Sequence, residues 1–243
     1  MNRTGRAMTL DRIAAELTKE LSGLRFAPPV EWVYNPLEYA REPHRVYLRR
    51  YGNGPKDIVL VGMNPGPWGM AQTGVPFGDV RAVRDWMGIE APVHPPANLH
   101  PKRPVLGFAC SRREVSGERL WGWAHQRFGS AEAFFERFFV ANYCPLMFLG
   151  KSGANLTPDK LRGAEARPLF AACDRALHRT IACLQPVHVV GIGRFAAGRA
   201  RSALAGLPPN VGGITHPSPA NPKANRGWEA LVMQELAALG IRL

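Results

Sequence analysis

The sequence has few cysteines and no closely spaced pair of them. The four cysteines stand at positions 110, 144, 173 and 183, so there is no C-x-x-C pair with which to build a zinc ribbon or a thioredoxin-type redox site. Cys144 and Cys173 lie in apolar stretches, which predicts buried, reduced thiols rather than ligands of an iron–sulfur cluster. The sequence also has no H-E-x-x-H motif and no clustered histidine pair, so it predicts no catalytic metal.

Long apolar segments and acidic side chains are also scarce. The first residues, Met1 to Leu10, are polar, which predicts no signal peptide, and no apolar run approaches the length that crosses a membrane. The sequence has only 19 Asp and Glu residues but 31 Lys and Arg residues, which gives a formal net charge of +12. This excess favours a polyanionic partner, most simply nucleic acid.

The length and the helical periodicity predict one domain with an N-terminal helix. The 243 residues, of which 46% are hydrophobic, are enough to bury one sizeable core. We expect residues 1–25 to form a helical extension, with Thr9 as its N-cap and Gly23 near its end. Its apolar residues recur at helical spacing: Leu10, Ile13, Leu17, Leu21 and Leu24. The aromatic and basic segment from Trp32 to Tyr51 is either a surface segment packed against the core or part of a rim that faces nucleic acid.

The most informative stretch runs from Asp57 to Phe77. Ile58 to Val61 is a continuous apolar run, typical of a strand buried on both faces. Glycine and proline then dominate the next fifteen residues, at Gly62, Pro65, Gly66, Pro67, Gly69, Gly74 and Pro76. This density predicts a stiff loop at the carboxyl end of a central strand, where open α/β sheets bind ligands. Asn64 and Gln72 are the amide side chains of that loop, and the aromatic ring of Phe77 closes it.

A second apolar run, Phe138 to Leu149, contains one asparagine. Asn142 stands where a core strand would prefer valine, and Pro145 predicts that the strand ends close to this asparagine. A buried amide is costly unless it is paired. Asn142 therefore either bonds neighbouring backbone at the strand end or directs both its donor and its acceptor at a ligand.

Two more strands are predicted towards the C-terminus. Val187 to Ile192 is apolar, and Val211 to Thr215 is a weaker candidate because it contains two glycines. His216 follows the last of these strands and begins a loop rich in proline and asparagine. The G-x-G before Arg194 lacks the third glycine of a dinucleotide-binding fingerprint, so we expect no nucleotide cofactor, although a phosphate could bind the following helix N-terminus.

The segments between the strands are predicted to be helices and one long loop. Helices are expected over residues 79–87, from about Glu114, from Thr157 to about Leu184, and from the end of the His216 loop to about Leu239. Residues 90–104 contain five prolines and are predicted to form the loop. Asp79 could act as a base, but an acidic residue is ordinary at a helix start.

The polar and aromatic side chains at the strand ends are expected to meet. If the helices connect parallel strands, the carboxyl ends share one edge, and Asn64, Phe77, Asn142 and His216 gather there. An aromatic face with an amide is suited to a planar heterocycle such as uracil, whose acceptor–donor edge asparagine can read. With the basic charge, this predicts a base of nucleic acid that is flipped out or supplied in a single strand.

Two long segments closely resemble signature motifs of the single-strand-selective monofunctional uracil-DNA glycosylases. They are G-M-N-P-G-P-W-G-M-A-Q-T-G-V-P-F-G over 62–78 and H-P-S-P-A-N-P-K-A-N-R-G-W-E over 216–229; N-Y-C-P-L over 142–146 and E-V-S-G over 114–117 fit as well. The resemblance implies a three-layer α/β/α sandwich around a short, mainly parallel four-stranded sheet. It also implies hydrolysis of the N-glycosidic bond of uracil, and of 5-modified uracils such as 5-hydroxymethyluracil, after base flipping and without a cofactor.

The resemblance also implies roles for particular residues. Asn64 would orient the attacking water, and His216 would hydrogen-bond the uracil O2 as charge develops. Phe77 would stack on the flipped base, and Asn142 would read its edge. The base pocket would also be lined by Gly62, Met63, Gly66 and Met70. A DNA-binding loop over 217–227 would wedge into the duplex and would include Pro217, Ser218, Pro219, Ala220, Asn221, Lys223 and Arg226.

The residue types fit simple hydrolysis. An amide cannot take a proton at neutral pH, so Asn64 can only hold the water, and the barrier must fall by stabilisation of charge. Nothing indicates a desolvated amine at Lys223, so no lyase activity is expected. Ala220 stands where the family can carry a bulky basic residue, and Trp68 replaces a smaller aromatic. These departures bear on duplex penetration and on the range of bases.

Two alternatives remain open at the level of the sequence. The chain could be a related glycosylase that acts mainly on another deaminated base, such as xanthine or hypoxanthine, or a non-catalytic DNA-binding module with the same fold. For the favoured hypothesis we expect single-stranded and double-stranded DNA as partners, free uracil as product and a monomeric protein. We expect it in the cytoplasm, at the nucleoid or in a nucleus according to its source.

Overall fold

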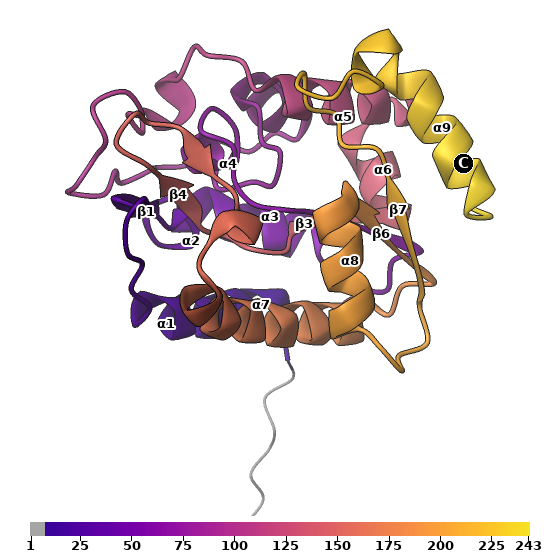
Figure 1. The fold of residues 1–243 in the computed structure, drawn as a ribbon. Coiled ribbons are helices and arrows are strands. Elements are labelled where there is room, and N and C mark those ends of the chain that lie inside the picture. Colours follow the sequence, from indigo (N-terminus) through magenta and orange to yellow (C-terminus); the bar gives the residue numbers. More distant parts are fainter. Residues whose placement is uncertain (1–7) are drawn as a thin grey trace, which may run out of the picture.

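A four-stranded parallel sheet forms the centre of the computed structural model, which describes residues 8–243 (Figure 1). The strands stand in the order β3-β2-β6-β7. Their bounds are Ile58–Gly62 for β2, Phe138–Asn142 for β3, His188–Ile192 for β6 and Asn210–Ile214 for β7. Every residue of β2 is buried, as a central strand requires. The register places Gly62 opposite Asn142, so the predicted shared edge of carboxyl ends is confirmed.

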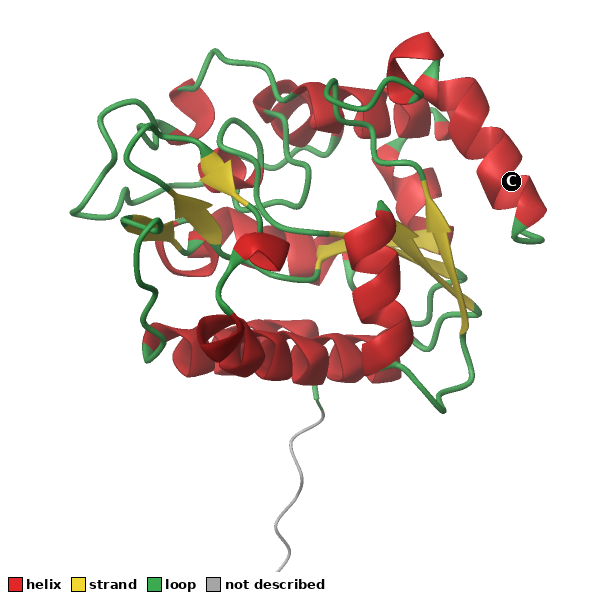
Figure 2. Ribbon diagram, in the orientation of Figure 1, coloured by secondary structure: helices red, strands yellow, loops and turns green. Residues whose placement is uncertain are grey.

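Helices cover both faces of this sheet and give the three-layer arrangement (Figure 2). Successive residues of β7 point to opposite faces: Gly212 packs against Leu239, just beyond α9, and Gly213 packs against Ala197 of α8. One layer holds α1 (Leu10–Ser22), α7 (Gly163–Leu184) and α8 (Arg194–Ala203), and the other holds α5 (Val115–Phe128), α6 (Ala131–Arg137) and α9 (Trp228–Ala238). The fold class predicted from the resemblance is thus confirmed.

Short elements complete the chain. The longer of the remaining helices is α3 (Arg41–Tyr51), and single turns of helix form α2 (Pro36–Tyr39) and α4 (Met70–Thr73). Turns of 3-10 helix lie at Gly107–Ala109, Pro158–Lys160 and Ala224–Arg226, and Ala82–Trp86 forms a π-helical turn. Residues 90–104 form an irregular loop, as their prolines predict.

A second, smaller sheet was not predicted. It is antiparallel and consists of β1 (Trp32–Tyr34), β4 (Met147–Leu149) and β5 (Asn155–Leu156). The apolar run from 138 to 149 therefore supplies two strands of different sheets, because the chain turns through Pro145 between them. Similarly, the helix predicted from Thr157 begins only at Gly163, since Leu161 and Arg162 are extended.

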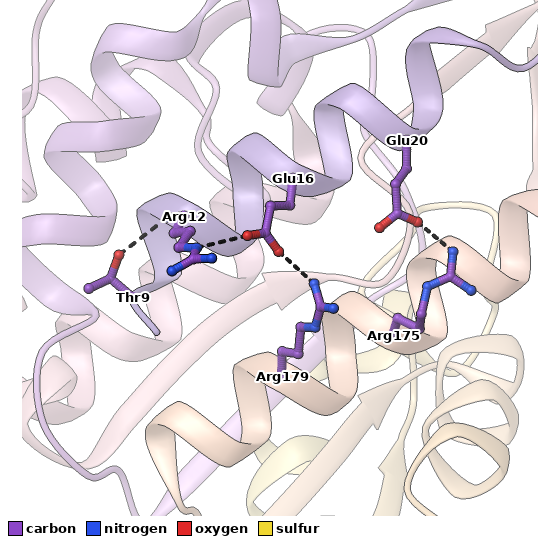
Figure 3. A network of polar contacts seen from close by, with 6 residues as sticks. All are labelled: Thr9, Arg12, Glu16, Glu20, Arg175 and Arg179. Carbon is purple, nitrogen blue, oxygen red and sulfur yellow. Dashed lines mark hydrogen bonds and ion pairs between the residues drawn. The ribbon is translucent and has the colours of Figure 1, made fainter. Parts of the chain in front are cut away.

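The N-terminal helix is joined to the rest of the protein by core packing and by charge. Leu10, Ile13 and Leu21 belong to the main hydrophobic cluster, and Thr9 caps α1 by accepting the Arg12 backbone N–H at 3.3 Å. Figure 3 shows two ion pairs between α1 and α7, Glu16 with Arg179 and Glu20 with Arg175, and the pair of Glu16 with Arg12 within α1. Residues 1–7 of the predicted extension lie outside the described residues.

The segment from Trp32 to Tyr51 is a packing segment rather than a nucleic-acid rim. Its tyrosines are buried, and Tyr47 donates a hydrogen bond to the Val140 carbonyl of β3 at 2.7 Å. Two of its arginines, Arg45 and Arg49, face Asp11 of α1 at 3.3 and 3.1 Å. The first of the two alternatives for this segment is therefore confirmed.

Candidate active site

Gly62 lies at the point where the loop after β2 meets the end of β3. A Cβ atom on Gly62 would lie 2.4 Å from Asn142 Oδ1 and 2.5 Å from Phe77 Cε2. Only glycine therefore lets the amide and the aromatic ring approach the same backbone position. Three residues of the predicted site, from two strands and one loop, meet here.

Phe77 is held in an unusual backbone conformation. Its φ is 54°, in the left-handed region that side chains other than glycine, asparagine and aspartate rarely adopt. The Phe77 carbonyl accepts the indole N–H of Trp121 at 3.0 Å and the backbone N–H of Asp79 at 2.8 Å. Gly117 of α5 packs directly against this carbonyl. Residues of α5 thus hold the Phe77 backbone in place.

Asn142 ends β3 with its side chain half-buried. Its Nδ2 donates to the Met70 Sδ at 3.2 Å, a weak acceptor, and its amide makes no hydrogen bond to backbone within residues 8–243. The sequence predicts that Asn142 either bonds neighbouring backbone or directs its amide at a ligand. The structure favours the second interpretation. The backbone after it is tied down, because Tyr143 and Cys144 donate to the carbonyls of Gly62 and Met63 at 2.8 and 2.9 Å.

Asn64 lies on the same loop, half-buried, and is oriented by a single contact. Its Nδ2 donates to the Leu146 carbonyl at 3.3 Å. The Oδ1 accepts no hydrogen bond from the described part of the chain. This carbonyl oxygen is thus available to accept a hydrogen bond from a water molecule, which is what the predicted role requires.

His216 completes the cluster from the end of β7. Its ring centroid lies 5.8 Å from that of Phe77, with the planes 39° apart. The backbone N–H of Ser218 donates to His216 Nδ1 at 3.0 Å. Because Nδ1 is the acceptor, the proton of the neutral ring stands on Nε2. Burial lowers the pKa of His216 from 6.5 to about 4, so the ring is neutral at physiological pH.

The strand end that carries His216 is anchored by Glu235 of α9. The carboxylate accepts the backbone N–H and the hydroxyl of Thr215 at 2.7 and 2.6 Å. Gly193, which follows the neighbouring strand β6 and has a φ of 90°, packs against the His216 side chain. These contacts set the position of the imidazole relative to the Phe77 ring.

The loop over 217–227 projects beyond the site and is braced from within. Asn225 donates to the Pro219 carbonyl at 2.8 Å, and Ser218 Oγ accepts the Ala220 N–H at 3.2 Å. Arg119 of α5 donates to the Pro217 carbonyl and to Asn225 Oδ1, both at 2.9 Å. The exposed residues of the loop include four of the predicted DNA contacts: Pro219, Ala220, Lys223 and Arg226. Lys223 is exposed, which agrees with an amine that is not desolvated.

Two polar residues noted in the sequence, Gln72 and Asp79, have structural roles. Gln72 is 1% exposed; it donates to the Pro67 and Pro104 carbonyls at 2.8 and 2.9 Å, and it is not part of the site. Asp79 is 4% exposed and accepts the backbone N–H groups of Arg81 and Glu114, both at 3.1 Å. Its carboxylate is therefore used as a cap, and it is not placed as a base.

Two supporting groups were missed at the level of the sequence. Glu114 lies directly against Gly66 and Gly69, and burial raises the pKa of its carboxyl. Behind Asn142, the Tyr143 hydroxyl donates to Asp174 Oδ1 at 2.7 Å, and Arg199 forms an ion pair with the same aspartate. Neither could be recognised from spacing, since the partners come from distant parts of the chain.

Neither a candidate metal site nor a membrane-spanning helix is found among the described residues. In residues 8–243, no three His, Cys, Asp or Glu side chains are grouped so that they could hold a metal ion. Cys110, Cys144 and Cys173 are buried and Cys183 is half-buried, all as free thiols. No helix among these residues is long and apolar enough to span a membrane.

The chain is similar to known proteins in sequence and in fold. The family model of the uracil DNA glycosylase superfamily matches residues 50–237. Proteins of mouse and rat that are described as single-strand selective monofunctional uracil DNA glycosylases are each 52% identical over 227 residues, which is 93% of this chain and 81% and 82% of theirs. A bovine protein of the same description is 52% identical and is covered to 84%. The crystal structure of SMUG2 from Pedobacter heparinus has the same fold, with a TM-score of 0.68 at 17% identity over 96% of this chain and 98% of that one.

Proposed function

The chain belongs to the uracil DNA glycosylase superfamily, and we propose that it is a DNA repair enzyme that hydrolyses the bond between uracil and deoxyribose. The observation that carries this proposal is that Asn142 and Phe77 meet beside Gly62, with the His216 ring next to that of Phe77. These groups supply an amide for the edge of a base, a flat face for its ring and a neutral N–H donor for its carbonyl.

The mechanism follows from the protonation state of His216. As the glycosidic bond breaks, negative charge develops on the uracil ring and positive charge on the sugar. The Nε2–H of His216 would donate to the uracil O2, where part of the negative charge collects. A preorganised donor in a site shielded from water contributes typically about 2.7–4 kcal/mol to such a step. Since the ring is already neutral, it stabilises the anion without transferring a proton.

Asn64 would hold the attacking water on the sugar side. Its Nδ2 is engaged by the Leu146 carbonyl, so its Oδ1 is the atom that faces the water. The amide orients this water but does not remove its proton, which is released as the sugar cation is attacked. The products are an abasic site and free uracil. Because no desolvated amine lies on the described loop, the reaction stops at hydrolysis.

We extend the proposal to the substrate range and the state of the protein. The rodent and bovine relatives are described as single-strand selective, and this chain would likewise act on uracil in single-stranded DNA and, more weakly, in duplexes. The 5-modified uracils, such as 5-hydroxymethyluracil, would also be released, and the enzyme would act as a monomer.

The test is release of uracil from an oligonucleotide that contains a single deoxyuridine. Alkali-labile cleavage and the free base are both measured, for single-stranded and duplex forms. Asn64→Ala and His216→Ala are each expected to lower the rate about 100-fold or more while leaving affinity for DNA nearly intact. Lys19→Ala, which changes an exposed residue of α1 outside the site, is the control and should retain the rate. A wild-type protein that releases no base from either form would contradict the proposal.

A further inference from the structure

A basic cavity lies beside the loop that carries Asn64. It has a volume of about 500 Å³ and is lined on one side by Trp68, which stands between Asn64 and Met70 of the site loop. Lys102, Arg103 and Arg112 contribute positive charge to its wall. None of these three basic residues belongs to the predicted site or to the loop over 217–227.

The cavity is fastened to the site loop by the buried Gln72. The amide donates to the carbonyls of Pro67 on the site loop and Pro104 on the neighbouring loop, and its Oε1 accepts the Leu106 N–H at 2.7 Å. The two walls of the cavity therefore hold a fixed position relative to the uracil pocket. In Figure 1 the magenta loop of residues 90–113 lies at the upper left, on the same side as α4, and the yellow loop of residues 217–227 lies towards the upper right.

The charges in the cavity are oriented but not neutralised. The Arg112 guanidinium stands 4.5 Å from the Trp68 ring centroid and that of Arg103 stands 5.4 Å from it, both within cation–π range. Arg103 is also fixed by a 2.8 Å hydrogen bond to the Gly153 carbonyl. Within residues 8–243, no carboxylate forms an ion pair with Lys102, Arg103 or Arg112.

This state differs from that of other arginines in the protein. Arg175 and Arg179 on α7 face glutamates of α1, as Figure 3 shows, and Arg113 next to the cavity is paired with Glu118. The half-buried carboxylate of Glu114 lies beside Trp68 and accepts the Trp68 backbone N–H at 3.4 Å. Unneutralised guanidiniums that are held in place beside an indole favour an anionic, bidentate ligand such as a phosphate.

We propose that this cavity binds the backbone phosphate of a nucleotide next to the extruded uracil, on the same strand, when that nucleotide is unpaired. The inference rests on the proposed function and adds a second contact to it. A single strand is flexible enough to bend into a cavity beside the site, whereas a nucleotide that remains in a duplex is held away by its neighbours. The cavity would thus contribute to the preference for single strands independently of the loop over 217–227.

The test compares Arg112→Gln with Arg113→Gln. Arg113 is the matched control because it is the neighbouring arginine and its charge is already paired with Glu118. Affinity is measured for a single-stranded oligonucleotide with 2′-fluoro-2′-deoxyuridine, which resists cleavage. One set of these oligonucleotides carries an uncharged methylphosphonate on the 5′ side of the uracil nucleotide, and a second set carries it on the 3′ side. Duplex forms with paired neighbours are measured in parallel.

Arg112→Gln is expected to weaken single-strand binding about tenfold and to reduce the salt slope by about 0.7, with little change for duplexes. This loss should disappear for one of the two methylphosphonate strands, and Arg113→Gln should bind like wild type. Equal affinity of wild type and Arg112→Gln, or a loss that neither methylphosphonate removes, would overturn the inference. Uracil release by the wild type is scored separately, so failure of the proposed function is distinguished from failure of the cavity.

Discussion

The backbone N–H of Ser218 donates to Nδ1 of His216 at 3.0 Å, and this contact decides which nitrogen of the neutral imidazole carries the proton. Two residues of the same short segment thereby produce a neutral ring with its proton on Nε2. A charged ring would lose the Ser218 bond, since both nitrogens would then be donors.

The pH dependence of base release should follow this arrangement. Burial lowers the pKa of His216 from 6.5 to about 4, so the active neutral form persists well below pH 6.5. We expect kcat/KM to stay level through pH 6.5 and to fall only near pH 4, in a single-turnover assay on single-stranded substrate. An acid limb centred near pH 6.5 that disappears in His216→Asn would show that the ring is protonated in the free enzyme and would contradict the account.

Stability should depend on pH through two histidines. Burial lowers the pKa of His44 to about 4 as well, and its Nδ1 bonds the Gly74 carbonyl at 2.8 Å. Because both folded pKa values lie below the usual 6.5, the unfolded chain binds more protons between pH 4 and 6.5. The stability that the neutral rings contribute is therefore fully present above pH 6.5 and is lost as the pH falls towards 4.

Thermal unfolding at a series of pH values measures this effect. The melting temperature should fall as the pH is lowered from 6.5 to 4, and the fall should be smaller in His44→Gln. A wild-type melting temperature that rises as the pH is lowered from 6.5 to 4 would contradict this prediction.

Gly62 should tolerate no side chain. In Gly62→Ala the new methyl group would lie 2.4 Å from Asn142 Oδ1 and 2.5 Å from the Phe77 ring, and both groups would have to move. Displacement of about 1 Å in a site typically costs about 100-fold in rate, and we expect a loss of that order. Gly122→Ala in α5 is the control, because its Cβ would meet nothing within 4 Å. Equal rates of base release in the two variants would argue against the close packing seen here.

The exposed Ala220 should limit activity on paired uracil. It lies on the braced loop over 217–227, whose hydrogen bonds to Ser218 and Arg119 involve backbone or neighbouring side chains. A longer basic side chain could therefore be placed there without disturbing the loop. Ala220→Arg should raise release from duplex DNA severalfold relative to single strands, and Ala220→Gln controls for size without charge. A ratio that stays unchanged in both variants would remove Ala220 as the reason for strand preference.

The sequence predicts the main sheet and the loop after its central strand well, for physical reasons that are local. The apolar run Ile58 to Val61 and the glycines after it specify a buried strand and a tight loop without reference to the rest of the chain. The three strands of the small sheet have only two or three residues each, too few for a periodic pattern to be visible. Their pairing is decided by tertiary contacts.

The roles that the sequence did not reveal depend on contacts between distant segments. Gln72 resembles a ligand-binding amide until its partner Pro104 is seen, and Arg119 gains its role from Pro217, which is 98 residues away. Such contacts cannot be predicted from the alternation or spacing of residue types in the sequence. The protonation of His216 likewise follows from its burial and from Ser218, not from its position after a strand.

The proposed function requires Asn142, Phe77 and His216 to hold one uracil together, and a crystal structure with bound free uracil tests this most directly. We expect the uracil ring to lie on the Phe77 face, with its edge paired to the Asn142 amide and its O2 within hydrogen-bond distance of His216 Nε2. Uracil bound elsewhere, or bound here with His216 Nε2 directed away from it, would contradict the account.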